Sequence, residues 1–207
     1  KLIWSREEDM LHGFYHPTTR ARLTGVLDGE GNLTALHLRI SGQSILASAM
    51  PERLQEGKDP VVFQGVATGG PLGTIGYDIG DLLVDHAMRN PPVPPGFWRG
   101  VNLNQNAFYL ESFIDELAHA AGADPLAFRR RLMANHPRHL AVLEAVAAAI
   151  GWDTPAPEGV HRGLAQIMGY GSYVAAAAEV SVTGGRLKIH RLVAATDPGH
   201  VVNTAQV

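Results

Sequence analysis

Cysteine is absent from the sequence, which excludes disulfide bonds, thiolate metal ligands and cysteine nucleophiles. Long hydrophobic runs are absent as well. The longest mostly apolar stretches, residues 142–150 and 174–178, fall short of the roughly 20 residues in a membrane-spanning helix. The formal net charge is −3, so the basic excess typical of nucleic-acid binding is missing, and no nucleic-acid partner is expected.

The 207 residues have an ordinary globular balance, 45% hydrophobic and 18% charged, which is enough to bury a core. The length suits one large domain or two small ones. Residues 1–5 read as a strand already under way, and no terminating signal follows residue 199. We therefore expect both ends to be cut from a longer chain. Unpaired strands at such cut edges would promote self-association.

Two runs of alternating apolar residues, 18–27 and 33–40, flank a turn-forming cluster at residues 28–32. This pattern predicts an antiparallel hairpin, so residues 1–45 are interpreted as a β-hairpin region. Residues 46–106 are rich in glycine and proline and are predicted to be irregular.

Residues 107–151 are predicted to be helical. Leu110, Ile114 and Leu117 recur with helical period, as on the buried side of an amphipathic helix. Asp124 is an N-cap signal for a second helix, and glycines follow the first and last periodic segments as stop signals. The three predicted helices span residues 107–121, 125–133 and 139–150.

Residues 160–207 are predicted to return to β structure, with a Gly-Gly turn joining the last two strands as a hairpin. Strands, then helices, then strands favour an α+β fold rather than a βαβ repeat. We expect antiparallel hairpins, or a sheet, flanking a central group of helices. The predicted strands span residues 163–168, 172–182 and 186–195.

Common site motifs are not matched. Residues 68–73 are glycine-rich but lack the Gly-Lys-Ser/Thr of a phosphate-binding loop. Ser172 has Val174 where a nucleophile elbow needs glycine. No histidine pair offers the three or four converging ligands of a zinc site, so no metal site is predicted. The pairs considered are His12 with His16, His136 with His139, and Asp197 with His200.

Charged residues of the predicted helices receive structural interpretations. Residues 129–131 are three consecutive arginines, which we interpret as a solvated helix face rather than a nucleic-acid site. Glu111 and Asp115 share a helix face without an evident third group. They are interpreted as capping or pairing residues, and nothing marks them as a general acid and base.

The most distinctive segment spans residues 94–106. Two prolines stiffen its entry, and Gly96 and Gly100 permit tight turns around an aromatic pair and Arg99. A helix is expected to begin at residue 107, with free backbone N–H groups at its start. Together these features suit a polyanionic or oxo-rich ligand. A buried structural role for Arg99 is an equal alternative.

These residues resemble a known family. Residues 96–100, 105–108 and 111–118 are similar to the segment that meets the molybdenum cofactor in xanthine dehydrogenase and aldehyde oxidase large subunits. The variant is most similar to the branch of the isoquinoline 1-oxidoreductase beta-subunit, which includes membrane-associated bacterial aldehyde dehydrogenases. Further similar patches extend the resemblance along the chain, at residues 2–10, 12, 15–17, 124–129, 151–152, 172–175, 179–182 and 197–203.

The resemblance implies a partial molybdopterin-binding domain over residues 1–207, with residues 46–106 as its cofactor-facing part. It implies oxidative hydroxylation of an aldehyde or N-heterocycle, with water as the oxygen source. The implied cofactor is molybdopterin in its cytosine dinucleotide form, bound by the full-length subunit. The implied partners are an iron–sulfur small subunit and, as an optional addition, a cytochrome c. The implied cofactor-binding residues are Trp98, Arg99, Gly100 and Gln105.

The departures from the family pattern limit the expected activity. Val101 and Asn102 follow Arg99-Gly100 where xanthine dehydrogenases continue with an aromatic residue and glycine, and Pro198 stands where the branch often has cysteine. A glycine loop is expected before residue 1 and the catalytic glutamate beyond residue 207. The catalytic base therefore stays unknown, and the isolated chain is expected to be inactive and to bind no cofactor.

Two other classes of function are weighed against this one. A non-catalytic assembly module of the same fold is the main alternative, and an independent hydrolase or metal enzyme is disfavoured by the unmatched motifs. The compartment is open between the bacterial cytoplasm and the periplasmic side of the membrane.

Overall fold

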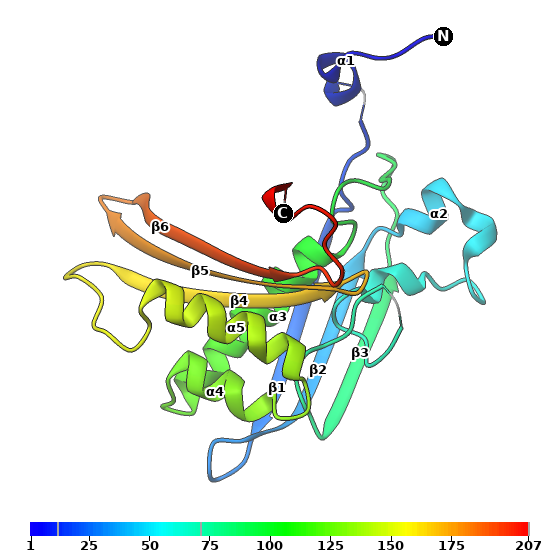
Figure 1. Cartoon of the computed structure of the whole chain (residues 1–207). Coiled ribbons are helices and arrows are strands. Elements are labelled where there is room, and N and C mark those ends of the chain that lie inside the picture. The colour runs from blue at the N-terminus through cyan, green and yellow to red at the C-terminus, as the bar shows by residue number, and fades with distance from the viewer. Residues whose placement is uncertain (12, 71, 207) are drawn as a thin grey trace.

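Two three-stranded sheets frame the fold (Figure 1). The strands are β1 (Thr19–Leu27), β2 (Leu33–Gly42), β3 (Asp81–Met88), β4 (His161–Gly169), β5 (Ser172–Thr183) and β6 (Arg186–Asp197). The computed structural model describes residues 1–11, 13–70 and 72–206. In the first sheet β2 is central, antiparallel to β1 and parallel to β3. In the second, β5 is central and both pairings are antiparallel.

The predicted hairpin of β1 and β2 is confirmed. At its turn, the carboxylate of Asp28 accepts hydrogen bonds from the backbone N–H groups of Glu30 and Asn32, both at 2.9 Å. The bond from the Asn32 backbone, followed by that from its side chain, lowers the pKa of Asp28. An ionised carboxylate therefore holds this turn at neutral pH.

Residues 46–106 are less irregular than predicted. After the short helix α2 (Ile45–Ala49) they contain two 3-10 helices, η1 (Pro51–Arg53) and η2 (Pro60–Phe63), and then the strand β3. β3 pairs in parallel with β2, which is distant in sequence. The sequence before β3 therefore contains no hairpin turn that would predict the strand. Cross-strand partners such as Leu82 and Leu36 supply the packing that its own sequence does not reveal.

The strand predicted over residues 1–5 is not present. These residues are extended without a strand partner, and the helix α1 (Arg6–Leu11) follows them. None of the α1 residues is buried, and α1 projects from the rest of the molecule (Figure 1). Its first turn carries three acidic residues, which favour a helix N-terminus through the helix dipole.

The three predicted helices are confirmed as α3 (Leu103–Ala120), α4 (Pro125–Leu132) and α5 (Pro137–Ile150). The Asp124 side chain caps α4 by accepting from the N–H of Ala127 at 2.9 Å. Gly151 ends α5 in the left-handed conformation, with φ of 77°. α3 begins at Leu103 rather than at residue 107, which brings its start close to Arg99.

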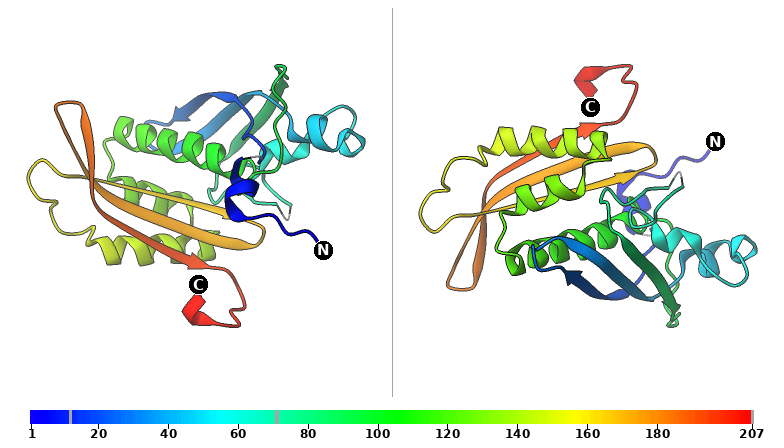
Figure 2. Two further views of the ribbon diagram at one scale, coloured as in Figure 1. Left: turned by 90° about the horizontal axis from the view of Figure 1, so that it is seen from above. Right: turned by 90° about the horizontal axis from the view of Figure 1, so that it is seen from below.

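α3 lies between the two sheets and contacts both β1 and β4 (Figure 2). Gly25 on β1 permits this close packing, because a Cβ there would lie 2.9 Å from Cδ2 of Leu117. α5 covers one face of the second sheet. The joint core includes Leu36, Leu38, Ile40, Leu110, Ile114, Phe128, Leu143 and Ile150. Among the described helices, none has the length and apolar content to cross a membrane.

Candidate functional site

The segment at residues 94–102 forms a tight surface turn before α3. The N–H of Val101 donates to the carbonyl of Trp98, and the N–H of Leu103 donates to the carbonyl of Gly100, both at 2.8 Å. Gly100 and Val101 have positive φ values of 88° and 52°. Such a φ is unusual for a β-branched residue such as valine, and it costs on the order of 1–3 kcal/mol. The loop is therefore held in a conformation that its neighbours must stabilise.

Gly100 is favoured by its positive φ, and the side chain of Asn104 lies directly against it. A Cβ at this position would overlap the side chain of Asn104. The Asn104 amide donates to the carbonyl of Arg99 at 3.2 Å. This arrangement closes the turn under Arg99 and leaves the Arg99 side chain on the exposed side.

A cluster of four amide side chains anchors the loop to the core. It consists of Gln64, Asn102, Gln105 and Asn106, of which all but Gln105 are buried. The Asn102 side chain donates to the carbonyl of Val61 at 3.0 Å, and the Gln105 amide donates to Oδ1 of Asn102 at 2.7 Å. The cluster therefore ties the start of α3 to η2.

Asn106 and Gln64 complete this amide cluster. The Asn106 side chain donates to the carbonyls of Val62 and Gln64, both at 2.8 Å. The Gln64 amide in turn donates to the hydroxyl of Tyr170 at 2.8 Å, in the turn between β4 and β5. Sequence reasoning did not find the cluster, because Gln64 is remote in sequence. The run of amide residues at the start of α3 was the available signal.

The N-terminal segment packs on the loop from the other side. The rings of His16 and Trp98 stack with centroids 5.7 Å apart, and the N–H of Gly96 donates to the carbonyl of Tyr15 at 3.1 Å. Nδ1 of His16 is buried and has no hydrogen-bond partner among the described residues. A hollow of about 210 Å³ beside this contact is bordered by Phe14, Trp98 and Arg99, among others.

The predicted cofactor-binding residues lie close together, but their side chains differ in exposure to solvent. Phe97 and Trp98 are each 38% exposed, and Arg99 is exposed without an ion pair to any described residue. The alternative of a buried structural role for Arg99 is therefore wrong. Gln105 is half-buried, and its amide N–H is directed to Asn102. An exposed cation without an ion pair fits an anionic, oxo-rich group.

The N–H groups predicted to be free at residue 107 lie inside α3, because the helix begins at Leu103. The N–H of Asn102 donates to Oε1 of Gln64 at 2.9 Å, and those of Val101 and Leu103 close the turn. The amide cluster and the turn thus satisfy three N–H groups at the entry to α3. Arg99 is the exposed charged side chain of this loop.

The histidine pairs do not converge with further ligands. His136 faces Asp78, with Nε2 to Oδ1 at 3.2 Å, while Nδ1 of His139 lies 2.6 Å from Oε1 of Gln166. Asp197 pairs with Arg138 at 2.7 Å. His12 lies outside the described residues. Within the described part of the chain, no group of three or more histidine, aspartate or glutamate residues could hold a metal ion.

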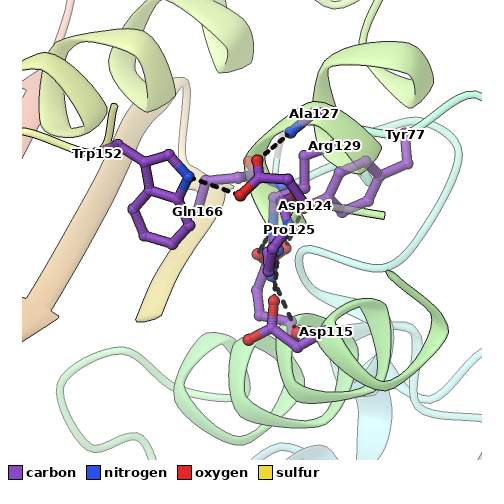
Figure 3. A network of polar contacts seen from close by, with 9 residues as sticks. Tyr77, Asp115, Asp124, Pro125, Ala127, Arg129, Trp152 and Gln166 are labelled. Carbon is purple, nitrogen blue, oxygen red and sulfur yellow. Dashed lines mark hydrogen bonds and ion pairs between the residues drawn. The ribbon is translucent and has the colours of Figure 1, made fainter. Parts of the chain in front are cut away.

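Arg129 is buried rather than part of a solvated helix face, so that prediction is wrong for this residue. Its guanidinium donates to the carboxylates of Glu111 at 3.0 Å and Asp115 at 2.6 Å (Figure 3). It also donates to the backbone carbonyls of Pro125 and Glu111. Arg129 is thus the third group that the sequence left unassigned beside Glu111 and Asp115. Arg130 and Arg131 remain exposed, as predicted.

The Arg129 network extends beyond α3 and α4. The Tyr77 hydroxyl donates to Oε1 of Glu111 at 2.7 Å, and the Gln166 amide donates to the same oxygen at 3.2 Å. Burial, together with the negative charge of Glu111, raises the pKa of Tyr77 well above its usual value. Burial lowers the pKa of His139, which therefore stays neutral at pH 7. The network joins the core but lies apart from the exposed Arg99 loop.

Comparison with known proteins relates this fold to a family, although no protein-family model matches the chain. The chain is 28% identical to the beta chain of isoquinoline 1-oxidoreductase of Brevundimonas diminuta, covering 97% of this chain and 26% of that protein. It is 30% identical to one of the subunits of nicotinate dehydrogenase of Pseudomonas putida, covering 87% and 17%. The resemblance to the molybdenum hydroxylases is confirmed.

Structural comparison agrees at the level of the fold. The molybdenum hydroxylase quinoline 2-oxidoreductase from Pseudomonas putida 86 superposes with a TM-score of 0.54 at 19% identity. The match covers 88% of this chain and 24% of that protein.

A third curated relative, the membrane-bound aldehyde dehydrogenase [pyrroloquinoline-quinone] of Gluconacetobacter polyoxogenes, is 26% identical over 98% of this chain and 29% of its own length. The chain thus spans between 17% and 29% of the curated relatives' lengths.

Proposed function

We propose that the chain is part of the molybdenum-cofactor-binding large subunit of an oxidoreductase that hydroxylates aldehydes or N-heterocycles. The names of the relatives support the class of reaction, since they include an isoquinoline oxidoreductase, a nicotinate dehydrogenase and an aldehyde dehydrogenase. Residues 1–207 would form a partial molybdopterin-binding domain. Its partners would be an iron–sulfur small subunit and, optionally, a cytochrome c.

Trp98, Arg99, Gly100 and Gln105 would face the cofactor. When bound, molybdopterin in its cytosine dinucleotide form would supply the molybdenum centre that accepts electrons from the substrate carbon while water provides the oxygen. Arg99 would contribute positive charge beside an anionic group, and Trp98, stacked on His16, would form an apolar wall. Gly100 would allow close backbone approach. Gln105 would act as a positioning residue through its bond to Asn102.

The exposed guanidinium of Arg99 on a rigidly anchored turn is the observation that carries this proposal. The test is molybdenum and pterin analysis of the full-length subunit, comparing wild type with Arg99→Ala and with the exposed Arg22→Ala as a matched control. A charge-assisted hydrogen bond of roughly 1.5–3 kcal/mol predicts that Arg99→Ala loses about tenfold or more in molybdenum occupancy or turnover. Arg22→Ala should leave both unchanged.

A second candidate is a non-catalytic assembly module of the same fold. It is favoured by the uncovered apolar side of the second sheet, where Ile189 and Leu192 are 61% and 66% exposed. A folded full-length subunit without molybdenum would overturn the enzyme proposal and favour this module. Stoichiometric molybdenum that Arg99→Ala removes or inactivates would decide for the enzyme. The 207-residue chain by itself is proposed to be inactive and to bind no cofactor.

A further inference from the structure

The second sheet has an apolar side that the described residues leave largely uncovered. α5 packs on the opposite side and buries residues such as Leu164, Ala175 and Ala177. In each strand, every second residue points to the uncovered side, as the strand register shows. Apart from His161 at the start of β4, none of the residues on this side is acidic or basic. We call this side the open face. Its larger members are Ile167, Val174, Val180, Val182, Leu187, Ile189 and Leu192.

Exposure on the open face is high where β5 and β6 extend past α5 (Figure 1). Val182, Leu187, Ile189 and Leu192 are between 61% and 66% exposed. A sheet with only one covered side normally carries polar residues on the other. Apolar residues on both sides are instead typical of a sheet that is covered on both. A contiguous exposed apolar surface of this kind marks an interaction site.

The charged residues of the same hairpin point the other way. Arg186, Lys188 and Arg191 pair across the ladder with Thr183, Ser181 and Glu179 on the side that carries α5. The hairpin therefore presents basic groups on one side and apolar groups on the other. This alternation fixes which side meets water and which side is left for burial.

A hollow deepens the open face next to α3. Its volume is about 390 Å³. It is bordered mainly by apolar residues, including Phe108, Val180 and Leu192, and on α3 also by Glu111 and Asp115 of the Arg129 network. Phe108 on α3 is 69% exposed. The hollow could accept one or two large apolar side chains, since packing of such groups into a preformed recess is typical of interface centres.

The identity of the occupant follows from geometry and from length. A second copy that paired edge to edge along β6 would leave the open face uncovered, so pairing of this kind does not provide its occupant. The curated relatives, in contrast, carry about three to six times the length of this chain. Such additional polypeptide can supply the apolar cover.

We propose that the open face is the docking surface for another segment of the same large subunit, outside residues 1–207, which inserts apolar side chains between Phe108 and Leu192. This inference rests on the proposed function only in assuming a full-length subunit. It does not require that molybdenum is bound. The occupant is therefore intramolecular and apolar, and it covers the tip of the β5–β6 hairpin.

Photo-cross-linking of the full-length subunit tests the proposal. A benzoylphenylalanine would replace Leu192 in one variant and Lys188, on the opposite side of the hairpin, in the control. After irradiation, digestion and mass spectrometry, Leu192→benzoylphenylalanine should yield a cross-link to a peptide of the same polypeptide outside residues 1–207, at least tenfold above the Lys188 control.

The other outcomes overturn the proposal. A cross-link to residues 1–207 of another molecule would identify a second copy as the occupant, and no cross-link above the control would show that the open face is uncovered. Molybdenum content of the same preparation separates this result from the proposed function. A cross-link without molybdenum supports the docking surface and defeats the enzyme, whereas molybdenum without a cross-link does the reverse.

Discussion

The guanidinium of Arg129 serves two carboxylates and two backbone carbonyls inside the core. Burial by itself would lower the pKa of Arg129, but the negative charges of Glu111 and Asp115 raise it. The side chain therefore stays charged in the folded protein. A buried pair of this kind adds little over a well-packed apolar core, yet removal of one partner leaves the other charge unpaired.

Arg129→Ala should lower the free energy of unfolding by about 3–5 kcal/mol, because it leaves Glu111 buried without its cation. The matched control is Arg131→Ala, since Arg131 is exposed and only contacts the ring of Phe128, 5.4 Å from the ring centroid. We expect the control to change stability by less than about 1 kcal/mol. Urea unfolding followed by circular dichroism measures both, and equal losses would refute the role of Arg129.

Tyr77 predicts a specific response to alkaline pH. Because its pKa is raised in the folded state, its contribution to stability is fully present below the unfolded pKa of about 10. This contribution is lost as the pH rises through the higher folded value. Tyr77→Phe should therefore flatten the fall in stability above about pH 10. Tyr15→Phe, at a 65% exposed residue, should leave the fall unchanged. Thermal melts across pH 8–11 would show the difference, and parallel curves for wild type and Tyr77→Phe would contradict it.

At the scale of elements, the Arg99 loop depends on the amide cluster beneath it. Asn106→Ala would leave the carbonyls of Val62 and Gln64 without this donor, at a cost of about 1–3 kcal/mol. We expect faster hydrogen exchange at residues 99–102 in this variant, measured by mass spectrometry. Gln55→Ala, at an exposed residue, is the control. Unchanged exchange in Asn106→Ala would mean that the loop is held by other contacts.

Elements with local signals could be predicted from the sequence. Helical period and caps located α3, α4 and α5, and the turn at Asp28 located the β1–β2 hairpin. β3 could not be predicted, because its partner strand is distant and parallel. The same reason explains the Arg129 network and the amide cluster, since Arg129 and Gln64 meet their partners only after the chain has folded. For the candidate site, the sequence singled out the Arg99 loop but predicted the helix to begin at residue 107, whereas α3 begins at Leu103.

At the scale of the whole molecule, α3 packs between the two sheets, and Gly25 allows α3 to lie close to β1. Gly25→Ala should destabilise the fold by about 1–3 kcal/mol through overpacking against Leu117. Gly29→Ala is the control, because a Cβ there meets nothing within 4 Å, and its effect should stay within about 0.5 kcal/mol. Differential scanning calorimetry compares the two. Similar melting temperatures would mean that Leu117 moves aside without cost.

The parallel pairing of β2 with β3 has a consequence for the order of folding. The β1–β2 hairpin needs only the short turn at Asp28, but the β2–β3 ladder forms after residues 43–80 have closed a long loop. Closing such a loop lowers the conformational entropy of the chain before stabilising contacts form. Pairing between strands that are distant in sequence therefore slows folding. β3 should therefore join its sheet late, after the hairpin and the helices. The amide cluster needs η2 from the same long loop, so the Arg99 turn acquires its final shape only in the last stage of folding.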